Sequence, residues 1–403
     1  MFNLKEHSMN RLLFMGCTAY LLVGLAHVII GSLLTELLDH YHLHYSNGGQ
    51  LIFTQFSGFL LGVLLVPWMT AKFSKRTTLI MMLVGLGLAQ IAYGFLPPWP
   101  FMYVIGFIAG AGFGSIEAIV GTLIIESIHE KKAKAMSRLE VFFGVGALIM
   151  PVVAGWMIYI GYWYLSFYII GAAALLLALG FKLLPFGQAE AHLSRKVSKT
   201  TKAAIPLRYN NKEKYILLFC ILFFLIYVGS EMSLVNFLPS FLIVNLHLDS
   251  VSATNSVTYF WLTMAIGRVF TGIIADKVNH AAFLLWSTFG AVIFTVLFAF
   301  VFNSWTAFAV VLLIGLFMSG IFAISLIYAN HLLPGKTEST TSILIASGGI
   351  GGALMPLMIG WLMDHYSVSA AVLFIISGTV ILLIMSFIAY RVRGNTVVPS
   401  TGK

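Results

Sequence analysis

The chain has 403 residues, of which 60% are hydrophobic and only 9% are Asp, Glu, Lys or Arg. A soluble domain carries about 25% charged residues, so this composition excludes a soluble enzyme, a nucleic-acid-binding domain and a disordered chain. At about 20 apolar residues per membrane-spanning helix, the chain contains enough apolar residues for about twelve spans.

Apolar runs long enough to cross a membrane recur along the whole chain. They are too long for barrel strands and lack strict alternation, so we expect helices. Met1 to Asn10 shows no removable signal peptide, so the first run is expected to stay as a span. The expected spans are Leu12–Leu38, Gly48–Thr70, Thr78–Leu96, Phe101–Ile128, Ser137–Ile160, Trp163–Leu184, Tyr215–Val244, Ser252–Ala275, Ala282–Phe302, Trp305–Leu333, Thr341–Met363 and Val368–Arg391.

The basic residues indicate how these spans are oriented. All 23 Lys and Arg residues lie before the first span or around the ends of even-numbered spans. The positive-inside rule therefore predicts a multi-pass protein of the cell membrane with both termini in the cytoplasm. The net charge of +9 then serves to orient helices, and we expect no nucleic-acid partner.

One long polar stretch, residues 185–214, divides the chain and reads as a cytoplasmic linker. We expect an N-terminal six-helix bundle over 1–184 and a C-terminal six-helix bundle over 215–403. The predicted fold class is an all-α integral membrane protein with twelve transmembrane helices in two pseudo-symmetric bundles.

A short repeat supports this duplication. The fifth span contains Met150-Pro151-Val152-Val153-Ala154-Gly155-Trp156 and the eleventh contains Met355-Pro356-Leu357-Met358-Ile359-Gly360-Trp361. The shared pattern is M-P-x-x-x-G-W. Duplicated halves with a site between them at the membrane midplane are typical of secondary transporters.

The eighth span ends in a glycine- and charge-containing run, Gly267-Arg268-Val269-Phe270-Thr271-Gly272-Ile273-Ile274-Ala275-Asp276-Lys277. It resembles the signature of the major facilitator superfamily at a cytoplasmic loop. The resemblance implies that Arg268 and Asp276 form a cytoplasmic gate, a charge pair that breaks on opening. The alternative is that the two residues only anchor a helix end, and both roles are compatible.

Carboxylates inside the spans are the strongest functional signal. A charged side chain there costs about 2.5–3.5 kcal/mol on insertion scales, so it needs a reason. Glu117 and Glu231 lie deep in spans four and seven, and Glu140 lies about one turn inside span five. The other half does not repeat Glu117 or Glu140, because Phe322 and Ile345 stand at the matching positions.

A carboxylate removed from water holds a proton more readily, which suits proton coupling. By sequence position no basic residue lies at mid-membrane depth to neutralise Glu117 or Glu231. Bound sodium, a hydrogen bond to a hydroxylated substrate, or a structural hydrogen bond between helices are alternatives. For Glu140, Arg138 offers a structural partner.

Several other polar or aromatic residues at membrane depth are candidates for substrate binding. Amides can both donate and accept hydrogen bonds toward sugar hydroxyls, and an aromatic face can stack on a sugar ring. A lone His or Trp in a span more often serves packing. The candidates are His27, Gln55, Asn236, Trp261 and Asn330.

The two cysteines lie in apolar runs and show no metal-ligand spacing. Three histidines beside Asp39 (His40, His42 and His44) read as a solvated loop rather than a metal site. We expect no metal, no cofactor and no enzymatic activity.

A closer family resemblance rests on several short motifs. Ser115-Ile116-Glu117 in a glycine-rich span and Met136-Ser137-Arg138-Leu139-Glu140 resemble the fucose/galactose/glucose:proton symporter family. Gln55-Phe56-Ser57-Gly58-Phe59-Leu60 and Asn236-Phe237-Leu238-Pro239 are similar to its bacterial glucose/mannose:proton symporter branch. The resemblance implies a role for Glu117 in substrate binding and proton coupling. The family's fucose transporter has a membrane aspartate in the first span, where His27 is the nearest polar residue here.

The leading hypothesis is a secondary active transporter that takes up a hexose or similar sugar with protons by alternating access, acting as a monomer in the bilayer. The alternative is a proton-driven efflux transporter for drugs or amphiphilic metabolites, because 33 Phe and 17 Met residues could line an adaptable cavity. A membrane sensor is disfavoured, since no soluble domain is present to pass on a signal.

Overall fold

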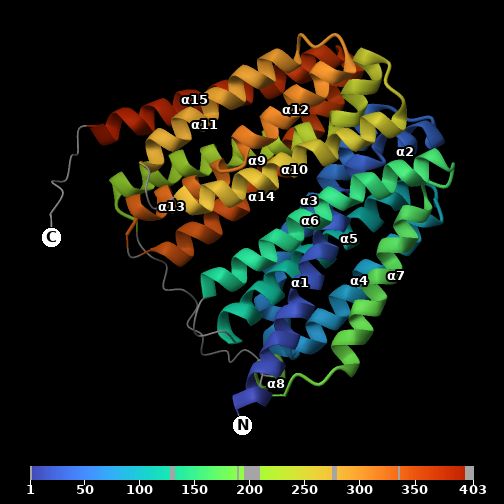
Figure 1. The fold of residues 1–403 in the computed structure, drawn as a ribbon, viewed down its shortest axis with the longest axis vertical. Helices are drawn as coiled ribbons and strands as arrows, with labels where there is room; N and C mark the ends of the chain where they lie inside the picture. Colours follow the sequence, from blue (N-terminus) through green and yellow to red (C-terminus); the bar gives the residue numbers. More distant parts are fainter. Residues whose placement is uncertain are drawn as a thin grey trace.

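The computed structural model describes residues 2–127, 132–187, 190–194, 209–274, 279–334 and 336–394, which fold almost entirely into helices (Figure 1). In a bilayer this is required, because lipid offers no hydrogen bonds and a helix satisfies its own backbone. The helices are α1 (Phe2–Ser32), α2 (Leu34–Tyr41), α3 (Tyr45–Lys72), α4 (Lys75–Gly94), α5 (Trp99–Ser127), α6 (Lys132–Tyr159), α7 (Leu165–Leu183), α8 (Glu190–Ser194), α9 (Asn211–Leu246), α10 (Ser250–Ile274), α11 (His280–Phe298), α12 (Ser304–Met318), α13 (Ile321–Leu332), α14 (Thr337–His365) and α15 (Val368–Gly394).

Within the described residues, eleven helical segments are long and apolar enough to cross a membrane. They correspond to all the expected spans except Ser252–Ala275, which coincides with α10, a helix of 25 residues rich in Ser and Thr near its start. Large apolar side chains are exposed on the outer surfaces of several of these helices, among them Leu64, Leu176 and Trp286. Such a surface is suited to lipid rather than to water.

Three expected elements differ in detail from the structure. The first span was expected to run to Leu38, but α1 ends at Ser32 and α2 follows as a separate short helix. The tenth span is divided into α12 and α13 by a turn at Ser319 and Gly320. The expected linker contains the short helix α8 and the first turn of α9, and its residues 195–208 lie outside the described part.

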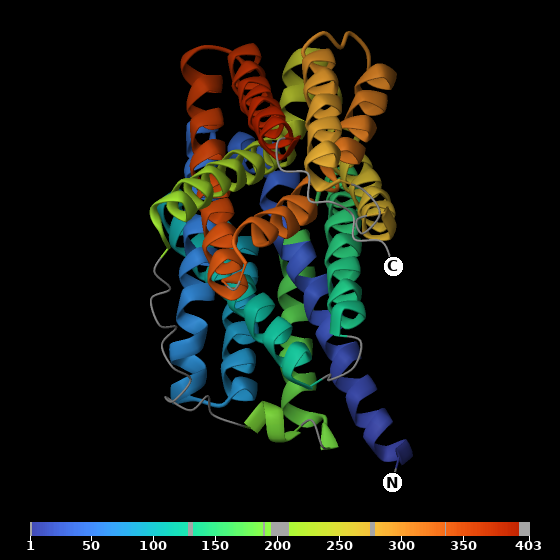
Figure 2. The ribbon, with the colours of Figure 1, turned by 90° about the vertical axis from the view of Figure 1, so that its left-hand side faces the viewer.

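The helices pack in two groups, α1–α8 and α9–α15, which occupy opposite ends of the long axis in Figure 2, with α9 crossing between them. We call the end of the molecule where α2 lies and α3 begins the α2 end. The opposite end, where α3 ends and α9 begins, is the linker end. The two groups lie together at the α2 end, and their ribbons diverge toward the linker end (Figure 1).

The two groups contact each other through matching helices. Helix α3 packs on α14, and α6 packs on α10. The repeated M-P-x-x-x-G-W pattern lies in α14 and α6, and its glycines lie at these contacts. A Cβ atom at Gly360 would lie 2.4 Å from the Tyr45 carbonyl oxygen, and one at Gly155 would lie 3.0 Å from Asn255 Oδ1. The repeat therefore marks two of the contacts between the groups.

Polar contacts hold the groups together from the α2 end to the middle of the molecule. Thr35 Oγ1 lies 3.1 Å from Ser240 Oγ. Thr254 donates to the Ser32 carbonyl at 3.2 Å, and Thr258 donates to the Leu148 carbonyl at 3.1 Å. These pairs join α1, α2 or α6 of one group to α9 or α10 of the other.

Residues near the linker end make contacts inside one group. Arg76 at the start of α4 donates to the Phe181, Lys182 and Leu184 carbonyls at the end of α7 (2.7, 3.0 and 3.0 Å) and pairs with Glu190 of α8. A guanidinium group suits the unpaired carbonyls of a helix C-terminus. In the other group Lys336, just before α14, pairs with Glu213 at the start of α9.

Close approach of α3 and α5 depends on glycines. A Cβ atom at Gly110 would lie 1.9 Å from the Gln55 carbonyl oxygen, and one at Gly58 would lie 2.0 Å from the Phe107 carbonyl oxygen. Because these neighbours are backbone atoms, they cannot move aside without shifting a helix. The contact places α5, which carries Glu117, directly against α3, which carries Gln55.

We predict that Gly110→Ala lowers stability by about 1–3 kcal/mol, the usual cost of overpacking. The matched control is Gly85→Ala, because a Cβ atom at Gly85 of α4 meets nothing within 4 Å and alanine favours a helix over glycine by up to about 1 kcal/mol. Thermal unfolding in detergent, followed by intrinsic fluorescence, measures both. Equal melting temperatures for the two variants would contradict this account of the α3–α5 contact.

Candidate functional site

Glu231 is the most deeply buried carboxylate of the candidate site, with 4% of the residue exposed. It lies on α9, one turn after Tyr227, whose hydroxyl donates to the Met318 backbone carbonyl at 2.9 Å. Arg268 of α10 approaches Glu231, with 4.0 Å between Nη2 and Oε1. The expectation that no basic residue is available to Glu231 is therefore wrong.

Arg268 reaches this position because α10 packs against α9 within the same group. Its guanidinium carbon lies 5.8 Å from the centre of the Trp261 ring, about two turns earlier on the same helix, and its side chain is 33% exposed. Its expected gate partner, Asp276, lies outside the described residues. Within the described part of the chain, Arg268 pairs with Glu231 and lies against Trp261.

Glu117 and Glu140 belong to the other group. Glu117 is half-buried on α5, and Glu140 is exposed near the start of α6. The Tyr20 hydroxyl of α1 donates to the backbone carbonyl of Glu117 at 3.2 Å. Among the described residues, neither carboxylate has a hydrogen-bond partner, so both are available to a proton, an ion or a substrate.

Electrostatic interactions connect these charged residues across the two groups. The carboxylates of Glu117 and Glu140 repel each other, and Glu140 is attracted to Arg268. The geometry agrees, because a Cβ atom at Gly144 of α6 would lie 4.0 Å from Cβ of Ala265 in α10. Glu140 and Arg268 each lie about one turn from this contact, toward the linker end. A change of charge in one helix group therefore changes the electrostatic energy of the charged residues in the other helix group.

His27 of α1 lies in an aromatic cage formed by Phe56, Phe113 and Phe143. The ring centres of these residues lie 5.4, 5.6 and 5.6 Å from that of His27. Its Nε2 atom lies 3.3 Å from the sulfur of Met232 in α9. His27 thus contacts the opposite group directly, through a polarizable thioether rather than a charged residue.

Gln55 lies next to this cage. It is buried on α3, and its Nε2 atom lies 3.5 Å from the Ala26 carbonyl oxygen, one residue before His27. At that distance the hydrogen bond is weak, so the side-chain amide is only loosely held.

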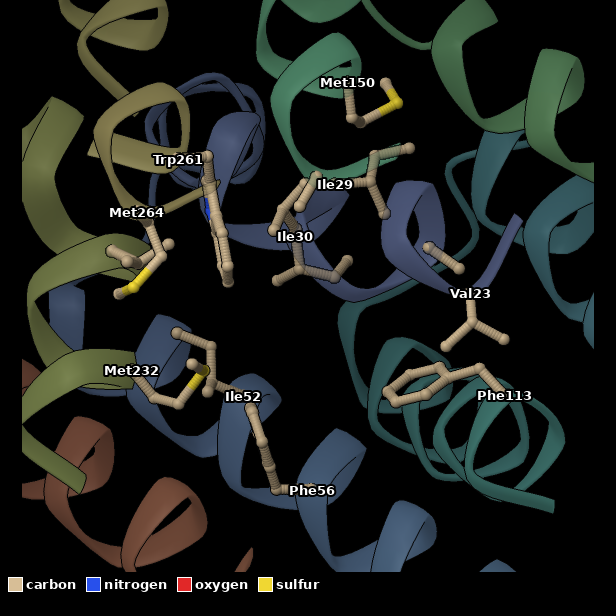
Figure 3. Packing of buried hydrophobic residues seen from close by; sticks show 14 of the residues in the cluster. Val23, Ile29, Ile30, Ile52, Phe56, Phe113, Met150, Met232, Trp261 and Met264 are labelled. Atoms are coloured by element: carbon tan, nitrogen blue, oxygen red, sulfur yellow. The ribbon is translucent and has the colours of Figure 1, made fainter. Parts of the chain in front are cut away.

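Trp261 lies where the two groups meet. Figure 3 shows its ring facing Ile30 of α1, with Met232 and Met264 nearby. The residue is 1% exposed, and its ring centre lies 6.2 Å from that of Phe143. Among the described residues its indole N–H has no acceptor. A buried donor without a partner is costly, so this N–H is suited to bind a ligand oxygen.

The remaining amides are tied to nearby helix backbone. Asn236 donates to the Met232 carbonyl of its own helix at 2.8 Å and packs tightly on Gly31 of α1. Asn330 donates at 3.0 Å both to the Leu326 carbonyl and to Thr341 Oγ1 near the start of α14. The structure places Asn330 toward the linker end and does not bring it to the residues around His27 and Trp261.

The structure adds residues that were not among the candidate site residues predicted from the sequence. Phe56, Phe113 and Phe143 read as ordinary span residues, since their convergence on His27 comes from three different helices. Ser115 and Ser233 have buried hydroxyls without partners in the described part of the chain. Their nearness in sequence to Glu117 and Glu231 was a signal that could have found them.

Comparisons with known proteins agree with this arrangement. The sequence profile of the Major Facilitator Superfamily matches residues 16–300 and 231–402. A curated relative, the glucose/mannose transporter GlcP of Bacillus subtilis (strain 168), is 31% identical over 353 residues, which cover 87% of each chain.

Solved structures of low sequence identity share the fold. A bacterial homologue of the human lysosomal transporter Spinster, in an inward-facing and occupied conformation, aligns over 97% of this chain and 99% of its own with a TM-score of 0.77 and 13% identity. The nucleoside transporter NupG (D323A mutant) aligns over 94% and 99% with a TM-score of 0.78 and 11% identity. The profile match and the 31% identical relative show that the chain belongs to the major facilitator superfamily, a family of transporters rather than enzymes.

Proposed function

We propose that the chain takes up a hexose or similar sugar together with protons, by alternating access between two six-helix bundles. The bundles span 1–184 and 215–403, joined by the linker 185–214, and α10 supplies the twelfth span. The main support is the cluster of Glu231, Arg268, Glu140 and Glu117 where the two groups meet. The similarity to a glucose/mannose transporter favours a sugar.

The positive-inside rule places both termini and the linker end in the cytoplasm of a cell-membrane protein. The α2 end then faces outward. The groups lie together at the α2 end and their ribbons diverge toward the linker end, which supports an assignment to the inward-facing half of the cycle. In this state the exposed carboxylate of Glu140 can exchange protons with the cytoplasm.

The polar and aromatic residues around His27 suit a sugar. The Trp261 indole N–H offers a donor that nothing in the described protein uses, and the Gln55 amide can both donate and accept. Aromatic side chains present apolar faces to the C–H face of a sugar ring. Trp261 and the cage around His27 share Phe143, so these groups can contact one substrate between the bundles.

The carboxylates suit proton coupling. Glu117 and Glu140 repel each other, and a proton on either one relieves that repulsion. Glu231 is stabilised as an anion by Arg268 at 4.0 Å, while Glu140 attracts the same arginine. Protonation in one group therefore changes the balance of charge in the other, which is what coupling of a proton to a conformational change requires.

We predict that Glu117→Gln abolishes sugar accumulation driven by an inward proton gradient, because the neutral amide cannot exchange a proton. Proteoliposomes loaded with labelled hexose should still show exchange. Glu36→Gln, in the short helix α2, is the control and should accumulate sugar normally. Gradient-driven accumulation by the Glu117 variant would contradict the proposal. Resistance to cationic dyes in overexpressing cells, without hexose uptake, would favour the efflux alternative.

We predict that Trp261→Phe raises the KM for sugar about 10- to 100-fold with little change in maximal rate, since it keeps an aromatic ring, although a smaller one, and removes the unpaired N–H. Loss of one hydrogen bond to a ligand changes affinity by about this factor. Trp286→Phe is the matched control, because Trp286 is 67% exposed on α11. An unchanged KM for the Trp261 variant would remove Trp261 from the proposed binding site.

We predict that Arg268→Met destabilises the protein more than the double variant Arg268→Met/Glu231→Gln. Removal of Arg268 alone leaves a buried carboxylate without its counter-ion, whereas the double variant removes both charges. The coupling free energy should be about 1–2 kcal/mol, within the range for residues in contact. Thermal unfolding of the two single variants and the double variant measures it. Additive losses would show that the two residues do not interact.

A further inference from the structure

The N-terminus of α3 is bound by an acidic residue from the other helix group. Asp364, near the end of α14, accepts hydrogen bonds from two backbone amides of α3. The Tyr45 N–H lies 2.9 Å from Oδ1, and the Ser46 N–H lies 2.6 Å from Oδ2. The close contact of Gly360 with the Tyr45 carbonyl, one turn before Asp364 on α14, brings the carboxylate to this position.

Helix α3 has no cap of its own. His44 precedes it with an extended backbone, its side chain makes no capping hydrogen bond, and the first turn contains no acidic residue. The first amides of a helix need acceptors, and a carboxylate there also interacts favourably with the helix dipole. The structure therefore supplies from α14 what the sequence around Tyr45 lacks.

Among the described residues, no carboxylate caps a helix across the matching contact between α6 and α10, where Thr258 instead donates to the Leu148 carbonyl. Helix α10 is capped from within its own group, because Asp249 accepts from the Ser252 N–H at 2.9 Å. This hydrogen bond to the charged form lowers the pKa of Asp249 below its ordinary value. Tyr159 stands four residues after Gly155, where α14 has Asp364 four residues after Gly360, and Tyr159 is 78% exposed.

We propose that Asp364 is a gating residue that holds the α2 end closed by capping α3 across the two groups. Separation of α3 from α14 would break both hydrogen bonds and leave α3 without a cap, whereas separation of α6 from α10 leaves the Asp249 cap intact. Among the described residues, opening at the α2 end is therefore opposed by a charged cap at the α3–α14 contact and by none at the α6–α10 contact. This inference rests on the alternating-access part of the proposed function and is independent of the sugar and of proton coupling.

The surroundings of Asp364 allow the bond to break and reform. A hollow of about 300 Å³ lies beside it, lined by residues that include Asp39, His44 and Tyr45. Asp364 is itself exposed, so water can replace it on the amides when the groups separate. A solvated cap of this kind is worth about as much as an ordinary helix cap, enough to bias an equilibrium without locking it.

The test is the distance between spin labels at the α2 end, measured without any substrate in lipid nanodiscs. Labels at Phe95→Cys and Phe302→Cys suit this purpose, because these residues are 72% and 86% exposed and belong to different groups. Cys17 and Cys220, which are free and buried, are replaced by alanine. We expect Asp364→Ala to raise the ratio of open to closed forms at this end about 5- to 10-fold, as loss of a cap does, and Asp364→Asn to lie between.

Asp249→Ala is the control matched by pseudo-symmetry, because it removes a cap that serves both conformations equally. It should lower the melting temperature without shifting the distance distribution. Equal distributions for wild type and Asp364→Ala, or an equal shift in Asp249→Ala, would overturn the proposal. These distances are measured without substrate, so the test remains valid even if none of the variants transports sugar.

A gain of a cap provides a second and opposite test. His44→Ser places a good capping residue directly before α3, so the helix keeps a cap after it leaves Asp364. We expect this variant, with Asp364 in place, to shift the distribution toward the open form at the α2 end. His44→Ala, which offers no cap, should not. A shift in His44→Ala equal to that in His44→Ser would contradict the capping mechanism.

Discussion

A polar group removed from water has to find a partner, and in this chain the partners come from neighbouring helices. The buried carboxylate of Glu231 on α9 has Arg268 of α10 within 4.0 Å. The bare N-terminus of α3 receives Asp364 from α14, and the C-terminus of α7 receives Arg76 from α4. The Glu231–Arg268 pairing satisfies a charge that would be costly alone in apolar surroundings. The two helix-end pairings satisfy backbone groups that a helix leaves without internal partners.

The duplicated scaffold and the asymmetric site follow different rules. Helices α3 and α14, and α6 and α10, pack through glycines placed by a repeated motif, so both of these contacts can be close. The polar residues do not follow the repeat: Phe322 stands where Glu117 would be matched, and Tyr159 where Asp364 would be matched. A symmetric frame allows two similar bundles to move against each other. The polar residues that lie between the bundles in one half only can select a substrate and give transport a direction.

The central region combines an apolar cage with a few unsatisfied polar groups. His27 is surrounded by three phenylalanines and the Met232 thioether, and the Trp261 indole N–H is buried without an acceptor among the described residues. A site that is mostly apolar and has a small number of oriented polar groups is the usual form of a small-molecule site. The charged residues lie beside this cage rather than in it, so charge and substrate can influence each other without direct contact.

The sequence by itself determined the membrane character, the positions of most helices and the identity of the buried carboxylates. Long apolar runs and the cost of a charge in lipid are local properties, so Glu117 and Glu231 could be singled out without a structure. Partnerships between helices are not local. The sequence motif suggested a gate or helix-end role for Arg268, yet α10 packs so that its side chain reaches Glu231. Asp364, which no sequence motif marked, caps α3. Only the tertiary structure decided these pairings, because they depend on which helices pack together and at what depth, and neither quantity is encoded in any single stretch of the chain.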